Sequence, residues 1–166
     1  MKYCQVTTES HPLAIAHPQF VEDINAIALA EGYIQPPIAF SNNETAINLD
    51  KVKRPVFVAQ GVDLPKSMDM TVGLKSNDAL QKEMLLVDFK LNVENPTRIR
   101  KIDMLEKVEH SSLLLGTAIP IRDEYIFVLQ TAKVQEARRW FSRYHARIPQ
   151  TYIAMDINTL KATYFD

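Results

Sequence analysis

The chain has 166 residues and a formal net charge of −1, with 46% hydrophobic and 23% charged residues. This length and composition predict a single folded domain over residues 1–166 that buries its own core. The near-neutral charge excludes a generally basic nucleic-acid coat and a polyacidic tail, but a local basic face is still compatible with it.

Cysteine usage and hydropathy predict a cytoplasmic protein. Cys4 is the only cysteine, so an intrachain disulfide and a metal site built on a cysteine cluster are both excluded. The N-terminal residues lack the apolar run of a signal peptide, and no segment approaches the roughly 18 apolar residues of a membrane span. We therefore expect a soluble protein without a membrane partner.

The first half of the chain is expected to hold one helix followed by two strands. Pro18 suits the first position of a helix and Gly32 suits its C-terminal end. Residues 33–53 give no clear pattern. The apolar residues of Pro55–Ala59 predict a strand, and the alternation over Met68–Leu74 predicts a second one.

The second half is expected to alternate strands and helices. The predicted elements are a strand at 84–91, a helix at 97–115 that ends at Gly116, a strand at 125–130, a helix at 134–145, and a hairpin of strands at 151–156 and 160–165. The buried face of the first of these helices is assigned to Ile99, Ile102, Leu105 and Val108. The fold class is α/β (α+β), a mixed central sheet with helices packed on it.

Two charged residues interrupt the most apolar predicted strand. Asp88 and Lys90 are two residues apart, so their side chains share one face of the strand, opposite Phe89. Charged groups buried without partners are costly, so solvent at the strand end, a partner or a metal ion must compensate.

A further acid, Asp69, stands near the start of the preceding strand. If the two strands are antiparallel neighbours, Asp69 comes close to Asp88 and Lys90. Two carboxylates that repel one another favour a shared divalent cation, and Mg²⁺ suits their oxygen ligands. Lys90 is then placed to orient a water or to stabilise charge that develops on a phosphate.

With Asp69 and Asp88-Phe89-Lys90 on consecutive strands, the chain resembles the PD-(D/E)XK nuclease superfamily, with its restriction-endonuclease-like core order of helix, three strands, helix and strand. The resemblance implies Mg²⁺- or Mn²⁺-dependent cleavage of phosphodiesters, with Asp69 and Asp88 as metal ligands and Lys90 as the water-orienting group. It also implies an acid from the first helix, for which Glu31 and Glu22 are equal candidates. Met68 stands where the family has a proline.

Nucleic-acid contacts are assigned to the predicted helix at 134–145 and the residues after it. Arg139, Arg143 and Arg147 recur every four residues and would line one face. Merely solvated arginines are the competing interpretation.

The charged residues of the helix at 97–115 could contact a substrate backbone, but we expect a solvated face there. These residues are Arg98, Arg100, Lys101 and Lys107.

Other interpretations stay open. An acid-x-Lys triplet is common enough to occur by chance, and Asp88 and Lys90 could form an exposed ion pair on an edge strand. The protein would then be a non-catalytic interaction or scaffold protein on the same kind of fold. A small-molecule enzyme has no positive sign in the sequence. Pairing of an apolar sheet edge with a second copy would make a homodimer.

Overall fold

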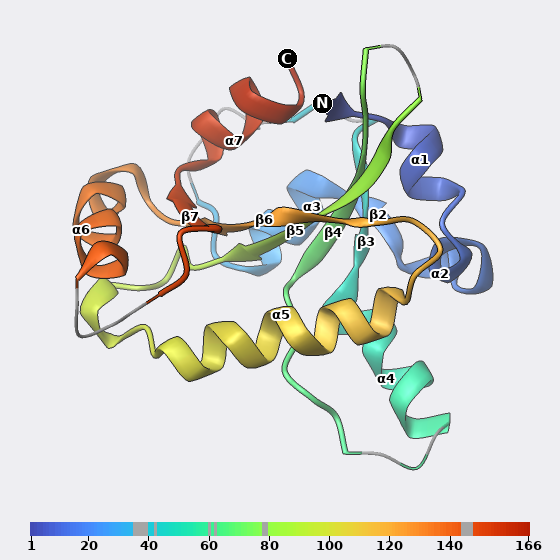
Figure 1. Ribbon diagram of the computed structural model, residues 1–166, viewed down its shortest axis with the longest axis horizontal. Coiled ribbons are helices and arrows are strands. Elements are labelled where there is room, and N and C mark those ends of the chain that lie inside the picture. The colour runs from blue at the N-terminus through green and yellow to red at the C-terminus, as the bar shows by residue number, and fades with distance from the viewer. Residues whose placement is uncertain (35–39, 42, 60, 62, 78–79, 144–147) are drawn as a thin grey trace.

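The structure, a computed structural model, describes all residues except 35–39, 42, 60, 62, 78–79 and 144–147. Within the described residues, seven strands form one mixed sheet with helices packed around it (Figure 1), which confirms the predicted α/β class. The strands are β1 (Lys2–Tyr3), β2 (Val21–Asp23), β3 (Thr45–Asn48), β4 (Met70–Lys75), β5 (Lys82–Phe89), β6 (Ile121–Val128) and β7 (Tyr152–Met155). The α-helices are α1 (Gln5–Glu9), α2 (Pro12–Ala16), α3 (Ile24–Ala30), α4 (Leu49–Ala59), α5 (Lys101–Leu115), α6 (Thr131–Ser142) and α7 (Ile157–Tyr164). Two short 3-10 helices are η1 (Pro18–Phe20) and η2 (Pro96–Arg98).

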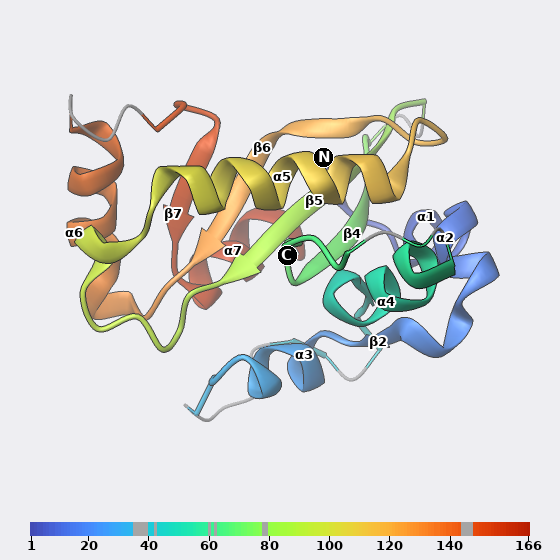
Figure 2. The ribbon, with the colours of Figure 1, turned by 90° about the horizontal axis from the view of Figure 1, so that it is seen from below.

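The strands lie in the order β2-β3-β4-β5-β6-β7, and β1 also pairs with β4. Neighbours from β2 to β5 are antiparallel, whereas β5, β6 and β7 are parallel. Parallel neighbours need a crossover between them, and α5 and α6 supply the two crossovers. In Figure 2, α5 lies across β5 and β6.

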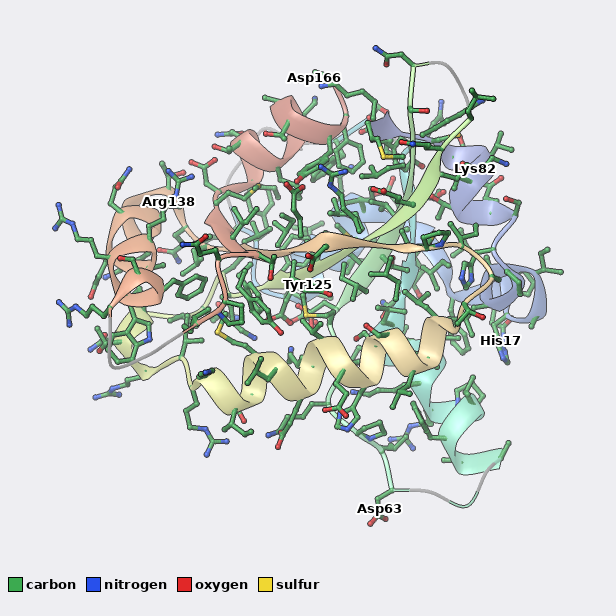
Figure 3. The ribbon with its side chains drawn as sticks, in the orientation of Figure 1. His17, Asp63, Lys82, Tyr125, Arg138 and Asp166 are labelled. Carbon is green, nitrogen blue, oxygen red and sulfur yellow. The ribbon has the colours of Figure 1, made fainter. Side chains whose placement is uncertain are left out.

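The sheet has a buried core on each face, and Figure 3 shows side chains filling the space on both sides. Alternation along β5 sends Leu86 toward the core under α5 and α6, and Val87 toward the core under α3 and α7. Asp88 has the same parity as Leu86, so its side chain faces α5.

The helix expected between Pro18 and Gly32 is shorter than predicted. The chain first makes η1 and then β2, which pairs with β3, and α3 begins only at Ile24. Asp23 sets this start, because its carboxylate accepts hydrogen bonds from the backbone N–H groups of Asn25 and Ala26. Residues 21–23, which the apolar periodicity assigned to the helix, therefore form strand β2 and pair with β3 instead.

The strand expected at Pro55–Ala59 is wrong, because these residues end helix α4. Asn48 helps to start that helix, since its side-chain oxygen accepts a hydrogen bond from the N–H of Lys51. Pro55 is accommodated inside the helix, and the buried positions are Leu49 and Val52. The β-forming residues after Pro55 therefore reflect local propensity that tertiary packing overrides.

The last strand of the expected hairpin, 160–165, is also wrong. Residues 160–164 belong to α7, whose N-terminus is capped by Asp156 through the N–H of Thr159. Ile157, Leu160 and Tyr164 are buried at helical spacing against the second core. The other half of the hairpin is present as β7.

The helix expected at 97–115 forms as η2 followed by α5, and Gly116 ends it with a φ of 66°. Its buried face was predicted only in part. Ile99 and Val108 are buried as expected, but Ile102 is 53% exposed, and Met104, Ser111 and Leu115 are buried as well. This shift in phase has a direct consequence for the site, because it turns Lys107 inward.

Among the described residues, five strands precede α5 where three were expected, and the last three of them are β3, β4 and β5, with α4 inserted between β3 and β4. The apolar strands β5 and β6 lie inside the sheet, and its edges are the short strands β2 and β7. Homodimerisation therefore stays a prediction with only short edges to carry it. None of the helices in the described part of the chain is long and apolar enough to span a membrane.

Candidate active site

The two predicted carboxylates meet at the junction of β4 and β5. Met70 pairs with Val87 in the antiparallel register. Asp69 directly precedes Met70 and Asp88 directly follows Val87, so the two acids lie side by side. The N–H of Asp69 donates to the carbonyl of Val87 at 3.1 Å, and its side chain accepts from the N–H of Phe89 at 2.6 Å. The expected approach of the two acids is therefore present.

The segment before Asp69 is held in place from the other side. The N–H of Met68 donates to the hydroxyl of Ser111 on α5 at 2.8 Å, and the carbonyl of Asp69 accepts from Leu49 at 2.9 Å. Both Met68 and Ser111 are fully buried. Asp69 and the residue before it are thus held by hydrogen bonds to the start of α4, to β5 and to α5.

Two lysines contact the two carboxyl groups. Lys90 Nζ lies 2.5 Å from Oδ2 of Asp88, as the shared strand face predicted. Lys107 of α5 contacts Oδ1 of Asp88, and its Nζ is 3.5 Å from Oδ1 of Asp69. One ammonium therefore touches both carboxyl groups. We call these four side chains the Asp–Lys cluster: Asp69, Asp88, Lys90 and Lys107.

Lys107 is the residue of the cluster that the sequence reasoning missed. It was grouped with a solvated helix face, but its side chain is only 19% exposed. The available signal was its spacing, because Lys107 is three residues after Met104 and four before Ser111, both of which are buried. The incorrect apolar face through Ile102 concealed this.

Burial dominates the electrostatics of the cluster. Asp88 is completely buried and Asp69 is 5% exposed. Desolvation, and then the nearby Asp88 carboxylate, raise the pKa of Asp69 to about 8, although Lys107 works in the opposite direction. Burial disfavours the charged form of Lys107, but Asp88 and Asp69 outweigh this and hold its pKa above the ordinary value. The cluster is therefore a strongly coupled set of charges.

One oxygen of the cluster lacks a conventional partner. Oδ2 of Asp88 is close enough to Lys90 for an ion pair, but within the described residues no donor reaches it with hydrogen-bond geometry. A buried carboxylate oxygen in this state suits a hard cation, and the adjoining Asp69 supplies a second oxygen donor. The two acids thus fit a divalent ion, which would have to compete with Lys107 for them.

Glu31 lies close enough to the cluster to interact with it electrostatically. Burial raises the pKa of Glu31 most. The Asp50 and Asp88 carboxylates raise it further, whereas Lys107 lowers it. Gly32, with a φ of 97°, ends α3 where a side chain would collide with Asn92 just after β5, and Asn92 donates to the carbonyl of Glu31 at 3.3 Å. This contact ties the end of α3 to the end of β5.

Of the two acids that were candidates for a further metal ligand, Glu22 is already engaged by other side chains. Glu22 lies in β2 and is occupied by Lys51 at 2.6 Å and by Asn48 at 2.9 Å. Within the described part of the chain, however, no three acidic, histidine or cysteine side chains come close enough to hold one metal ion. Glu31 is thus a neighbour of the cluster in this structure and not an assembled ligand.

The predicted arginine face is incomplete. Helix α6 ends at Ser142, so Arg143 caps it in an extended conformation and no longer continues the helical repeat from Arg139. Arg147 lies outside the described residues. The guanidinium of Arg143 stacks over Trp140 at 5.9 Å, and both Arg139 and Arg143 are exposed. The structure therefore brings neither Arg139 nor Arg143 into the Asp–Lys cluster.

Comparison of the chain with protein-family models, with curated proteins and with solved structures finds no match.

Proposed function

We propose that this protein is a Mg²⁺- or Mn²⁺-dependent phosphodiesterase that acts on nucleic acid. The observation that carries the proposal is the meeting of Asp69 and Asp88 across β4 and β5, with Lys90 on the same face. The core order of α3, β3, β4, β5, α5 and β6 agrees with the resemblance to PD-(D/E)XK nucleases, with α4 as an addition. Nucleic acid, rather than another phosphodiester, follows from that resemblance.

The roles follow from the contacts. Asp69 and Asp88 would hold the ion, and Glu31 is the acid nearest to joining them. When bound, such an ion polarises a phosphate oxygen and lowers the pKa of a bound water. Lys90 would orient that water or stabilise the charge on the phosphate, since its ammonium is next to Asp88 while the side chain is 21% exposed. Lys107 would leave the carboxylates and face the substrate.

A non-catalytic interaction or scaffold protein is the second candidate, and the bridging position of Lys107 favours it. Two lysines already contact the two aspartates, so the carboxyl groups have cationic partners without a metal. In that case the four residues only fix the packing of α5 on the sheet. The two candidates differ in whether a divalent ion displaces Lys107.

Cleavage assays separate the candidates. Purified protein is incubated with single- and double-stranded DNA and RNA in Mg²⁺, in Mn²⁺ and in a chelator, beside the Lys90→Ala variant. The proposal expects metal-dependent cleavage by the wild type and a loss of roughly 10²–10³ in rate for the variant. If the wild type neither cleaves any of these substrates nor binds Mg²⁺, the protein is not an enzyme of this kind.

A further inference from the structure

A basic cavity opens beside the Asp–Lys cluster, between the end of β5 and the start of α5. Its volume is about 260 Å³, and it is lined by Lys90, Val93, Arg98, Ile99, Arg100, Asp103, Met104 and Lys107. Four of these side chains are cationic and one is anionic. A water molecule occupies roughly 30 Å³, so the cavity holds a tetrahedral anion with space for water.

The wall that carries Arg98 is fixed by hydrogen bonds. Asn95 caps η2 through the N–H of Thr97 at 2.9 Å, and the indole N–H of Trp140 donates to the carbonyl of Ile99 at 3.3 Å. Arg98 therefore stands on a short, anchored helix rather than on a free loop. Its guanidinium has no ion-pair partner within the described residues, whereas Arg100 is held by Asp103 through two bonds of 2.6 Å.

The two lysines of the cluster also line this cavity. In the structure both are engaged by Asp88, so they contribute little free positive charge to it. If Asp69 and Asp88 bound a divalent ion, both ammonium groups would lose their carboxylate partners. Because both lysines line the cavity, their ammonium groups would then be available to it. Its apolar wall of Val93, Ile99 and Met104 strengthens their attraction for an anion.

We propose that this cavity binds a phosphate group of the substrate next to the one that is cleaved, and that it gains its full affinity only when Lys90 and Lys107 are released from Asp88. The inference rests on the proposed phosphodiesterase function. The phosphate is either a terminal monoester of the nucleic acid or an internal phosphodiester, because both present the same oxygens to Arg98.

Binding of inorganic phosphate tests the cavity without any turnover. Titration calorimetry at constant ionic strength compares the wild type in chelator and in Mg²⁺, together with Arg98→Ala and with Arg139→Ala as an exposed arginine control. We expect Mg²⁺ to strengthen phosphate binding and Arg98→Ala to weaken it about tenfold, as loss of a charged hydrogen bond does. Arg98 is exposed, so its replacement leaves folding intact.

The Asp88→Asn variant separates the cavity from the metal. Removing this carboxylate frees both lysines, so phosphate binding in chelator is expected to exceed that of the wild type; circular dichroism checks that the variant is folded. If Asp88→Asn gains phosphate affinity but Mg²⁺ has no effect on the wild type, the cavity is supported and the proposed metal site is refuted. If wild type and Asp88→Asn bind no phosphate in any condition, the inference is wrong even where cleavage is seen.

Oligonucleotides then identify the source of the phosphate. The same short strand is compared with a 5′-phosphate, with a 3′-phosphate and with hydroxyl ends, in Ca²⁺ to slow turnover. A terminal site expects one phosphorylated end to bind more tightly and Arg98→Ala to remove that difference. An internal site expects equal binding of the three strands and a uniform loss in Arg98→Ala. An Arg98→Ala variant that binds all three as Arg139→Ala does overturns the inference.

Discussion

The Asp–Lys cluster and the arginines of α6 contain similar charges in opposite environments. In the cluster, Asp88 is fully buried and its two lysines are about four-fifths buried, and two strands and a helix fix the geometry. On α6, Arg139 and Arg143 are exposed, and the helix ends before their spacing can build a continuous face. Charged side chains interact more strongly in the cluster than on α6, because the fold has removed most of the surrounding water.

The largest expected effect is on stability. Replacing Lys107 by Met leaves two buried carboxylates with one lysine, so the free energy of unfolding should fall by about 3–5 kcal/mol in urea titrations. Adding Asp88→Asn to this variant should recover part of the loss, because fewer charges then remain unpaired. A Lys107→Met protein as stable as the wild type would mean that the contacts of Lys107 contribute no more to the free energy of unfolding than an exposed ion pair does.

Metal binding should also appear as stability. At a Mg²⁺ concentration about 100 times the dissociation constant, unfolding should become harder by about 2.7 kcal/mol, and chelator should reverse the gain. Asp69→Asn should abolish this response in thermal melts, while Arg139→Ala should retain it. An equal response in both variants would place the ion elsewhere and remove the distinction between the two regions.

Burial can be tested as the deciding factor at a third place, His11. This residue is 1% exposed, its Nδ1 accepts from the N–H of Leu13, and burial lowers its pKa. The folded protein thus stays neutral at this position where the unfolded chain takes up a proton. The contribution of His11 to stability should be flat above about pH 6.5 and fall below it, by at most about 1.4 kcal/mol per pH unit.

The variant His11→Asn sharpens this measurement. Asparagine keeps an oxygen that can cap α2 but does not titrate, so it should flatten the acid limb of the stability curve. His17→Asn, on a less buried histidine, should leave that limb unchanged. An unchanged acid limb in His11→Asn would assign the pH dependence to other groups.

The smallest effect is expected from the α6 arginines. Arg139→Ala should change the free energy of unfolding by less than about 0.5 kcal/mol, as exposed substitutions usually do. If α6 contacts nucleic acid, the Arg139→Ala/Arg143→Ala variant should bind more weakly and with a shallower salt dependence. Filter binding at two salt concentrations measures both quantities, and wild-type behaviour would confine recognition to the neighbourhood of the cluster.

Local chemistry in the sequence was enough to predict the strands that carry the site. The apolar runs of β4, β5 and β6 are long, and their buried faces dominate any local alternative. The spacing of Asp88 and Lys90 placed them on one face because a strand alternates strictly, and Gly116 marked the end of α5 because it adopts a positive φ. The approach of Asp69 to Asp88 followed from antiparallel pairing of consecutive strands.

Tertiary structure alone decided the rest. Pro55–Ala59 became helical and residues 160–164 became α7 because their neighbours in space, not their intrinsic preferences, set which faces are buried. The phase of α5 follows from how it lies on the sheet, and a rotation of a fraction of a turn converts Lys107 from a surface charge into the bridge between two carboxylates. The two faces of a strand follow directly from the alternation of its residues, whereas the orientation of a helix about its axis depends on the side chains packed beneath it.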